Sequence, residues 1–489
     1  MKKRILGRLG EVGILLEPKA IDALMRLPDA DECVDRMVED PGNRALILTE
    51  EDIVGYARRD DDIIRGADDV LPGVEGAADK AAEQGAGRLK PGTVKVIKDI
   101  TGNSTCVGNV IDFAKLFKDR YLTLRKMLSK RRELAGQLPI ARVKKLERDL
   151  RFVGIVNDSH TTKNGHTIIE MEDETDKIMV LVMKGSARMN EAFLKDEILG
   201  VVGSFNRDGE LVVAKDVIRP DVPLSSGMAP NGSESIVAFV SDIHLGSNTF
   251  LDKAWKRLVD WLGRDPVAKD IRYVVMPGDL VDGIGVYPGQ EEELRLDDLY
   301  GQYLALSEAV KELPDRISIV AMPGNHDAVR LAEPQPALPN DIREMFDSNI
   351  EFVGNPCYLE IEGRVILAYH GKSMDDFNSG VRRLNYTNPQ EAMKEMLKRR
   401  HLAPVYGGKT PIAPEQKDYL VIDTVPDIFV TGHVHVCELD EYRGIKLINA
   451  SAWQSQTAFQ RMHNQTPDPA KVPMVHLGTG ECWVEDFSG

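Results

Sequence analysis

The sequence has few cysteines, little aromatic content and no long hydrophobic run. Its five cysteines are scattered through 489 residues, and no two of them form a Cys-x-x-Cys pair. This spacing excludes a zinc module built from thiolates and argues against a disulfide-stapled secreted scaffold. The longest apolar runs, such as residues 178–183, are far shorter than the roughly 20 residues that cross a bilayer. Because Arg8 and Glu11 also interrupt any apolar signal-peptide segment, we expect a cytoplasmic protein with no membrane partner.

The chain also lacks an excess of positive charge. Acidic residues number 78 against 62 basic ones, which gives a formal net charge of −16. A protein that coats nucleic acid through charge alone needs the opposite balance, because lysine and arginine neutralise the backbone phosphates. A site built on divalent cations would bring its own positive charge. If the substrate is DNA, metals or a basic partner must therefore supply the attraction.

Length and changes in composition predict several domains. Residues 1–55 carry apolar residues at helical spacing, among them Leu15, Leu16 and Leu24, and are predicted to form a helical N-terminal interaction module. Residues 56–92 are rich in Asp, Ala, Gly and Arg and are expected to be a flexible linker. Residues 93–149 are predicted to form a strand and a basic helix that lead into the next domain. This helix is interpreted as a solvated basic face, with contact to DNA or an anionic partner as the alternative.

Residues 150–220 change to the two-residue period of β-strands. Five strand candidates follow one another, at 152–156, 167–171, 178–183, 198–205 and 211–217. The pairs Asn164-Gly165 and Asp208-Gly209 are hairpin signals between them. Five short strands suit a small closed barrel of the oligonucleotide-binding type, with another small barrel or sandwich as the alternative. Because Phe152, Phe193 and Phe205 are its only aromatic residues, we expect the barrel to dock on protein rather than to stack on DNA bases.

Residues 236–489 alternate strand-like and helical patterns, and five apolar runs in this segment end directly on polar motifs. These motifs are Ser-Asp-Ile-His at 241–244, Gly-Asp-Leu-Val-Asp at 278–282, Gly-Asn-His-Asp at 324–327, His-Gly at 370–371 and Gly-His-Val-His at 432–435. In α/β sheets, ligands and chemistry collect at the carboxyl ends of strands. The five motifs are therefore expected to meet at one site.

The residue types in these motifs indicate a metal centre. Asp, His and Asn supply carboxylate oxygen, imidazole nitrogen and amide oxygen, a mixed donor set that suits Mn²⁺, Fe²⁺ or Zn²⁺. A single Asp-x-His is usually a turn with a solvated acid, but five of the chain's ten histidines fall within these motifs. The remaining five are interpreted as surface or structural residues: His160, His166, His401, His463 and His476.

The ordered set of motifs resembles the calcineurin-like metallophosphoesterase superfamily. The resemblance implies a β-sandwich flanked by helices over residues 236–489, with two metals at one edge. Seven ligands are implied: Asp242, His244 and His435 for the first metal, Asn325, His370 and His433 for the second, and Asp279 as the bridge. His326 would face the scissile phosphate without binding metal. Asp282 and Asp327 are expected to orient the ligands.

The chain as a whole resembles a narrower family, the small subunits of the archaeal family D DNA polymerases. The resemblance runs from about residue 95 to the end, more loosely over 1–55, and rests on the stretches VKVIKDITGNSTCVGN, GNHDAVRLAEPQP and INASAWQSQTAFQ. It implies an α/β multidomain protein with a helical N-terminal module, an oligonucleotide-binding-type barrel and the phosphoesterase domain. No motif of a synthetic polymerase site is visible in this chain.

The same resemblance implies an activity, cofactors and partners. The activity is 3′→5′ exonuclease proofreading on DNA with a single-stranded or mismatched 3′ end. The cofactors are two divalent metal ions, Mn²⁺ foremost, with Mg²⁺, Fe²⁺ and Zn²⁺ as alternatives. The partners are the large catalytic subunit, which together with the small subunit is required for DNA synthesis, and a sliding clamp.

Two other functions stay open. A catalytically silent structural or regulatory subunit would keep metals only to stiffen the fold, and a free-standing phosphatase would act on proteins or small nucleotides. The intact His326 argues against the first, because a purely structural site does not need that residue. The barrel and the N-terminal module argue against the second.

Two aromatic residues near the C-terminus also have two interpretations. Trp453 and Phe459 lie in a stretch with little charge, and each could be a core residue or a subunit contact. We favour contacts, because exposed aromatic side chains anchor interfaces. The sequence alone does not separate the two.

Overall fold

The computed structural model describes residues 92–146, 149–186, 192–347, 349–462 and 464–489, together with Leu15, Leu16, Leu24, Ile47 and Leu48. The chain divides into two units, residues 1–85 and 86–489. In the first unit, β1 (Leu15–Leu16) and β2 (Ile47–Leu48) pair in parallel, and Leu24 lies buried in a helix. The helical interpretation is therefore wrong for Leu15 and Leu16, because two adjacent apolar residues fit a strand as well as a helix. The rest of the predicted N-terminal module, and the predicted linker apart from Gly92, lie outside the described residues.

Two six-stranded sheets form the centre of the second unit. The first contains, in spatial order, β12 (Ile350–Phe352), β11 (Ser318–Met322), β10 (Ile271–Pro277), β9 (Ile236–Phe239), β18 (Lys471–His476) and β19 (Cys482–Asp486). The second contains β16 (Glu438–Tyr442), β17 (Ile445–Asn449), β15 (Ile428–Thr431), β14 (Arg364–Ala368), β13 (Cys357–Ile361) and β3 (Val94–Lys98).

The helices of this unit are α5 (Val110–Leu128), α6 (Ile140–Val143), α7 (Asp252–Arg264), α8 (Leu299–Lys311), α9 (Asn340–Arg343), α10 (Met374–Gly380), α11 (Pro389–Arg399) and α12 (Ala458–Met462). Short 3₁₀ turns occur at η1 (Arg132–Leu134), η2 (Val267–Asp270) and η3 (Gln290–Glu293). Within the part of the chain that the structure describes, no helix combines the length and the apolar character that a membrane span requires.

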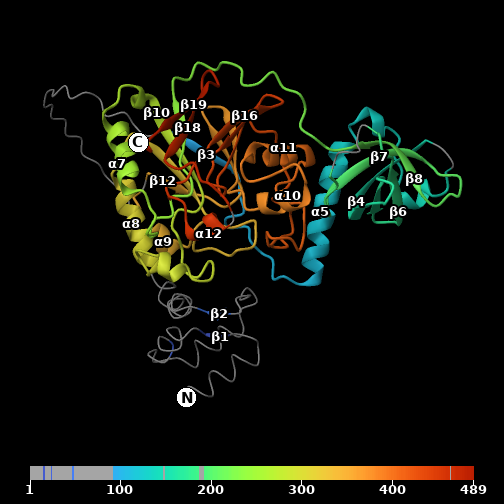
Figure 1. The fold of residues 1–489 in the computed structure, drawn as a ribbon, viewed down its shortest axis with the longest axis horizontal. Helices are drawn as coiled ribbons and strands as arrows, with labels where there is room; N and C mark the ends of the chain where they lie inside the picture. The colour runs from blue at the N-terminus through green and yellow to red at the C-terminus, as the bar shows by residue number, and fades with distance from the viewer. Residues whose placement is uncertain are drawn as a thin grey trace, which may run out of the picture. The chain divides into compact units, whose positions relative to one another are not determined.

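The two sheets pack face to face, and helices cover their outer faces (Figure 1). Val237 and Phe239 of β9 pack with Ile366 of the second sheet, whereas the alternate residues Ile236 and Ala238 face α7 and α8. On the other side of the molecule, α10 and α11 cover the second sheet. Both faces are thus covered at the centre of each sheet, which is why β9, β11, β14 and β15 are nearly continuous apolar runs.

Parallel strands bring the polar motifs to one edge of this sandwich. In the first sheet β9, β10 and β11 run parallel, and in the second β14, β15 and β17 do. Asp242, Asp279 and Asn325 follow the carboxyl ends of β9, β10 and β11. His370 and His433 follow β14 and β15. The α/β character expected from the sequence is therefore confirmed, and its layout explains how distant motifs meet.

The predicted strand before the basic helix has an unexpected neighbour. β3 pairs antiparallel with β13 at the edge of the second sheet, where Val96 lies opposite Leu359. The sequence places this strand only in a segment that leads into the barrel. Its period shows that a strand forms but not which distant strand completes its hydrogen bonds.

The five predicted strands after residue 150 form a closed barrel, as expected. Its spatial order is β4 (Leu150–Thr161), β5 (Thr167–Glu172), β6 (Lys177–Val182), β8 (Val212–Ile218) and β7 (Ile198–Phe205). Gly165 and Gly209 in the two predicted turns have φ of 80° and 75°. Glycine is needed there because a side chain strains that backbone conformation.

The basic helix α5 lies against the barrel rather than standing free in solvent. It begins at Val110 because Asn109 and Asp112 form a capping box. Its residues Tyr121 and Leu124 pack against the barrel. Arg120 is fully buried, and its Nε lies 2.7 Å from a carboxylate oxygen of Asp418. The interpretation as a solvated basic face is therefore wrong for Arg120, whose charge is paired inside the protein.

The two aromatic residues near the C-terminus have different positions. Trp453 is fully buried and packs edge-on against Trp255 of α7, with ring centroids 5.2 Å apart. It is a core residue, so our interpretation of it as a contact is wrong. Phe459, on α12, is 44% exposed. The two residues share a low-charge stretch, which is why sequence alone did not distinguish them.

Candidate metal centre

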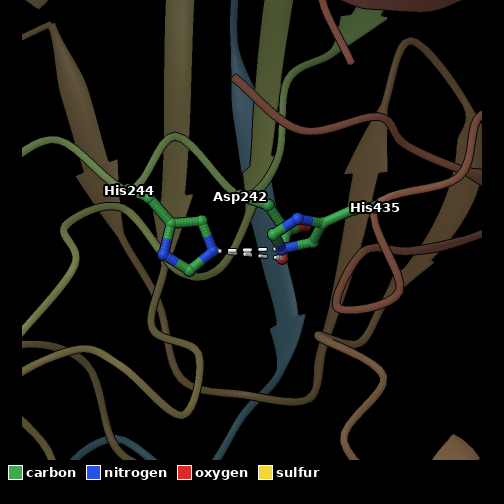
Figure 2. A group of neighbouring side chains, drawn as sticks. All are labelled: Asp242, His244 and His435. Atoms are coloured by element: carbon green, nitrogen blue, oxygen red, sulfur yellow. Dashed lines mark hydrogen bonds and ion pairs between the residues drawn. The ribbon is translucent and has the colours of Figure 1, made fainter. Parts of the chain in front are cut away.

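The residues predicted to hold the first metal lie together. Asp242, His244 and His435 each direct a possible ligand atom into a common space, and all are buried (Figure 2). Nε2 of His435 lies 3.4 Å from Oδ1 of Asp242 and 3.1 Å from Nε2 of His244. Nε2 of His244 lies 3.9 Å from the same carboxylate oxygen. The three side chains come from the ends of β9 and β15, which belong to different sheets.

The residues predicted to hold the second metal form an adjoining group. His370 and His433 gather with Asp279, their possible ligand atoms within 4.8 Å of one another. Nε2 of His370 lies 3.1 Å from Oδ1 of Asn325. Oδ2 of Asp279 lies 3.3 Å from Nε2 of His370 and 3.7 Å from Nε2 of His244. Asp279 thus lies between the two groups.

The backbone at these positions is unusual. Five of the seven predicted ligands have left-handed φ values: Asp242 51°, His244 48°, Asp279 50°, His433 70° and His435 58°. For residues other than glycine, such a conformation costs about 1–3 kcal/mol and persists only where the surrounding structure enforces it. Strained backbone of this kind concentrates at functional sites. The fold therefore holds these side chains in the cluster against a local preference.

The glycines of the motifs let the ligands approach each other. A Cβ atom on Gly324 would lie 2.2 Å from Oδ1 of Asp279, and one on Gly432 would lie 2.3 Å from Oδ2 of Asp242. Neither distance is sterically allowed, and both neighbours are predicted metal ligands. The glycines at these positions are therefore part of the site.

Asp282 fixes the ring of His244. Its Oδ1 lies 3.0 Å from Nδ1 of His244, so that Nε2 of the same ring faces the cluster. Gln290 and Gln454 each donate an amide N–H to the Asp282 carboxylate at 3.2 Å. This is the arrangement by which a carboxylate orients a metal-binding histidine.

Asp327 accepts hydrogen bonds from the backbone of the loops that follow β10 and β11. Its carboxylate accepts hydrogen bonds from the N–H groups of Leu280 and Gly324, at 3.1 and 2.8 Å, and from the hydroxyl of Tyr303 at 2.9 Å. These bonds join the loop after β10 to the loop after β11. Burial and the charge of Asp279 raise the pKa of Asp327 to about 6.

His326 lies beside both groups, with its side chain 15% exposed. Its Nδ1 lies 2.7 Å from the carbonyl oxygen of Asp282, which leaves Nε2 directed toward the cluster, 4.0 Å from Oδ2 of Asp279. The rings of His326 and His244 meet edge to face, with centroids 4.6 Å apart. The imidazole therefore points at the cluster, and its possible ligand atom lies within 4.8 Å of those of His244 and Asp282, outside the two groups predicted for metals.

The charges of the cluster are strongly coupled. Burial raises the pKa of Asp279, but the charges of His370 and His326 outweigh this effect and hold the pKa well below its usual range. Burial lowers the pKa of His370, yet Asp279 raises it to about 10. Against burial, Asp282 and Asp279 raise the pKa of His244 to about 9. These buried carboxylates require positive charge beside them, and metal ions compete with protons for such ligands.

One carboxylate of the site was missed by the sequence reasoning. Oδ2 of Asp375, at the start of α10, lies 3.5 Å from Nε2 of His433. Lys372 and Tyr386 also contact this carboxylate, at 2.7 and 2.9 Å. Burial raises the pKa of Asp375, but His433 and Lys372 hold it far below its usual range. The only sequence signal was its position five residues after His370, outside every quoted motif.

Glutamines form a second missed group. Gln460 of α12 places its Nε2 2.9 Å from Nδ1 of His435, and Gln454 contacts Asp282. Both lie in the stretch INASAWQSQTAFQ that supported the family resemblance. That stretch follows a strand of the second sheet and returns across the site. The sequence therefore pointed to this segment but assigned no role to its glutamines.

The ligand groups open into a cavity of about 570 Å³. Its lining includes His244, Asp279, Asn325, His326 and both histidines of the last motif. The donor atoms are carboxylate oxygens, imidazole nitrogens and one amide oxygen, a set that fits Mn²⁺, Fe²⁺ or Zn²⁺ better than it fits an all-oxygen Ca²⁺ site. Together with the coupled charges, this donor set fits a pair of divalent cations.

Comparison with known proteins identifies the class of this chain. Residues 237–437 match the family model for the B subunit of DNA polymerases alpha and epsilon. The DNA polymerase II small subunit of Archaeoglobus fulgidus is 43% identical over 392 residues, which cover 79% of each chain. That of Methanothermobacter thermautotrophicus is 37% identical over 490 residues, or 97% of this chain and 98% of the relative.

The class is thus that of the B subunits of DNA polymerases. Within it, the chain belongs to the family of DNA polymerase II small subunits, the small subunits of the archaeal family D polymerases. The resemblance of the whole chain to the small subunits of the archaeal family D polymerases is confirmed. A third relative, from Thermoplasma acidophilum, is 40% identical over 382 residues, which cover 78% of each chain.

Proposed function

We propose that this chain is the proofreading subunit of its polymerase, a metal-dependent 3′→5′ exonuclease that hydrolyses single-stranded or frayed DNA. The observation that carries the proposal is that all seven predicted ligands gather in two adjoining groups, beside a cavity that five of them line together with His326. The sandwich is then a calcineurin-like phosphoesterase domain over residues 236–489. The barrel is of the oligonucleotide-binding type over residues 150–220, with docking as its main role.

Two divalent cations, Mn²⁺ foremost, are the proposed cofactors. Asp242, His244 and His435 would hold one, Asn325, His370 and His433 the other, and Asp279 would contact both. When bound, the metals supply polarisation of the phosphodiester and activation of water for an in-line displacement. The positive charge of such metals would also offset, at the site itself, the repulsion between DNA and a protein of net charge −16.

The protein's own residues would position the strand and move one proton. The carbonyl of Asp282 holds the His326 ring, and its Nε2 faces the cluster. From there the imidazole would donate a proton to the leaving 3′ oxygen or a hydrogen bond to the phosphoryl group. Asp282 would keep His244 oriented, and Asp327 would hold the loops that carry Asp279 and Asn325 in register.

The preference for frayed ends follows from the energy of unpairing. A 3′ end must leave the duplex to reach a cavity in the protein, and a mismatched end costs less to unpair than a matched one. This difference makes the same hydrolytic site act as a proofreader.

The proposed main partner is the large catalytic subunit, because the relatives are named small subunits of a polymerase. That partner would hold the synthetic site, and the two chains together would be needed for DNA synthesis. A sliding clamp is a further proposed partner. The N-terminal module over residues 1–55, tethered by residues 56–92, would serve as an interaction site.

The full-length chain, alone and with the large subunit, tests the activity. With Mn²⁺ present, both preparations should remove nucleotides from a labelled strand with an unpaired 3′ end. His326→Ala should lower the rate about 100- to 10,000-fold, because a positioned proton donor contributes that much. The metal content of this variant, measured by mass spectrometry, should equal that of the wild type.

His160→Ala is the matched control, because the side chain of His160 is 58% exposed. Its rate should equal that of the wild type. If a mismatched 3′ end stays intact with the metal-loaded wild type, and also with its complex that contains the large subunit, the chain is a structural or regulatory subunit instead.

A further inference from the structure

The walls of the site cavity are of two kinds. Beyond the ligand groups, the lining includes the rings of Tyr287 and Phe459 and the lysines Lys372 and Lys409. Tyr287 contacts His326, whereas Lys372 pairs with Asp375 beside His433. This difference has no part in holding metals. It bears instead on how a substrate is held in the cavity beside the ligand groups.

The aromatic side forms one continuous surface. The ring centroid of Tyr287 lies 6.3 Å from that of His326 and 6.0 Å from that of Phe459. The Tyr287 and Phe459 planes are 37° apart, and at this distance the rings contact each other and leave no slot between them. The surface therefore extends from His326 through Tyr287 to Phe459.

Both rings are held in place from behind. The Tyr287 hydroxyl donates a hydrogen bond to Glu293 at 2.9 Å. Phe459 is on α12, whose next residue, Gln460, contacts His435. Phe459 is nonetheless 44% exposed. A large apolar ring that is fixed beside the cluster and still open to the cavity suits the face of a nucleic-acid base.

The lining also offers positive charge. Lys409 is exposed, and within the described residues its ammonium makes no ion pair, whereas Lys372 is paired with Asp375. In a chain of net charge −16, such a lysine in the lining attracts phosphate locally. A strand in the cavity would therefore place its backbone at the lysine and its base on the aromatic rings.

We propose that Tyr287 and Phe459 form a stacking platform for the base of the unpaired 3′-terminal nucleotide. The inference rests on the proposed exonuclease function and adds how the substrate is recognised. Stacking is tolerant of sequence, because every base has a π-face. It also requires a base that has left the duplex stack, so the platform selects unpaired ends whatever their sequence. Both rings are positioning residues, since they act on the base and not on the scissile bond.

Fluorescence of 2-aminopurine tests the platform without turnover. A single-stranded oligonucleotide with 2-aminopurine at its 3′ end is mixed with the full-length chain that carries His326→Ala, so that the strand stays intact. Binding should quench the fluorescence through stacking. Adding Phe459→Ala should remove most of the quenching, and Phe459→Trp should keep it. Met462→Ala, on the same helix and 75% exposed, is the control that should change nothing.

Kinetics on the otherwise wild-type chain provide the second readout. Phe459→Ala should raise KM for a strand with a 3′-terminal base about tenfold, a typical effect of losing one base–aromatic contact, with kcat within twofold. On a strand that ends in an abasic nucleotide, the variant and the wild type should have the same KM, because no base is present to stack.

The outcomes separate the two proposals. If the wild type cleaves the strand and Phe459→Ala leaves both KM and quenching unchanged, the platform is wrong and the exonuclease stands. If KM rises equally for the base and the abasic end, the ring does not act through the base, and the platform is again wrong. A wild type that does not cleave overturns the proposed function and the platform with it.

Discussion

At the scale of single residues, buried charge is neutralised within a few ångströms. Asp418 lies 2.7 Å from Arg120 and 3.0 Å from His401, and all three side chains are almost without solvent contact. Arg120 also donates to the carbonyl of Pro404. Removing Asp418 would leave the guanidinium of Arg120 charged in a low-dielectric interior, which costs more than the pair itself contributes.

His401 in this group predicts a pH dependence of stability. Burial and the charge of Arg120 lower its pKa to about 4 in the folded protein, with Lys98 acting in the same direction and Asp418 opposing them. In the unfolded chain the pKa is about 6.5. Between these values only the unfolded chain binds the proton, so the stability contribution is complete above about pH 6.5 and is lost as the pH falls toward 4.

The measurement is urea unfolding of metal-free protein between pH 7.5 and 4.5. Over this range the free energy of unfolding of the wild type should fall by up to roughly 3 kcal/mol relative to that of His401→Gln, whose side chain does not titrate. The ligand histidines titrate equally in both proteins and cancel in the difference. Parallel pH profiles for the two proteins would contradict the prediction.

At the scale of elements, the barrel is joined to the sandwich by buried ion pairs. Glu197, just before β7, lies 2.7 Å from Nε of Arg399 on α11 and 3.2 Å from Arg219 after β8. All of these side chains are at most 10% exposed. The backbone N–H of Asp221 also donates to the carbonyl of Lys398 on α11. The barrel is thereby fixed to the helix layer of the second sheet.

Glu197→Ala should therefore destabilise the chain by up to about 3 kcal/mol, because two buried guanidinium groups lose this carboxylate, although Arg399 keeps its pair with Glu395. Hydrogen exchange should become faster in β7, β8 and α11. Lys118→Ala is the control, since it removes a pair with Glu174 in which the side chains are 63% and 52% exposed. That change should stay within about 0.5 kcal/mol. Equal denaturant midpoints for the two variants would show that the attachment of the barrel to α11 does not depend on the ion pairs of Glu197.

At the scale of the whole molecule, the charge distribution decides how DNA could be bound. A net charge of −16 rules out broad electrostatic attraction to a strand. In the proposed complex, attraction would come from the bound metals and from a few cations at the cavity, of which Lys409 is exposed. Binding of a single strand should for this reason depend only weakly on salt.

Lys409→Ala should reduce that dependence further. In a plot of log affinity against log salt concentration, the slope should decrease in magnitude by about 0.7, the value for one phosphate contact on a single strand. The measurement is fluorescence anisotropy with a labelled oligonucleotide, in the His326→Ala background. Lys256→Ala, at an exposed position on α7, should leave the slope unchanged. An unchanged slope for Lys409→Ala would show that this lysine does not contact the strand.

Local patterns were sufficient for much of the fold and for most of the site. The barrel strands alternate buried and exposed residues, and Gly165 and Gly209 mark their turns, so a short window of sequence contains the information. The ligand motifs follow strands directly, and parallel strands must end at a common edge. Asp375 and Gln460 were not predicted, because neither lies at the end of a strand and each reaches the cluster through a helix placed by packing.

The sequence by itself determined most of the segments that become strands, most of the side chains that gather at the candidate site, and the family to which the chain belongs. The tertiary structure alone decided that β3 completes the second sheet, that Trp453 is core and that Tyr287 joins Phe459 beside His326. The physical reason is that periodicity and motifs report the local environment of a residue, exposed or buried, turn or strand. Which distant surface provides that environment depends on how whole layers pack, and no short window of the chain contains that information.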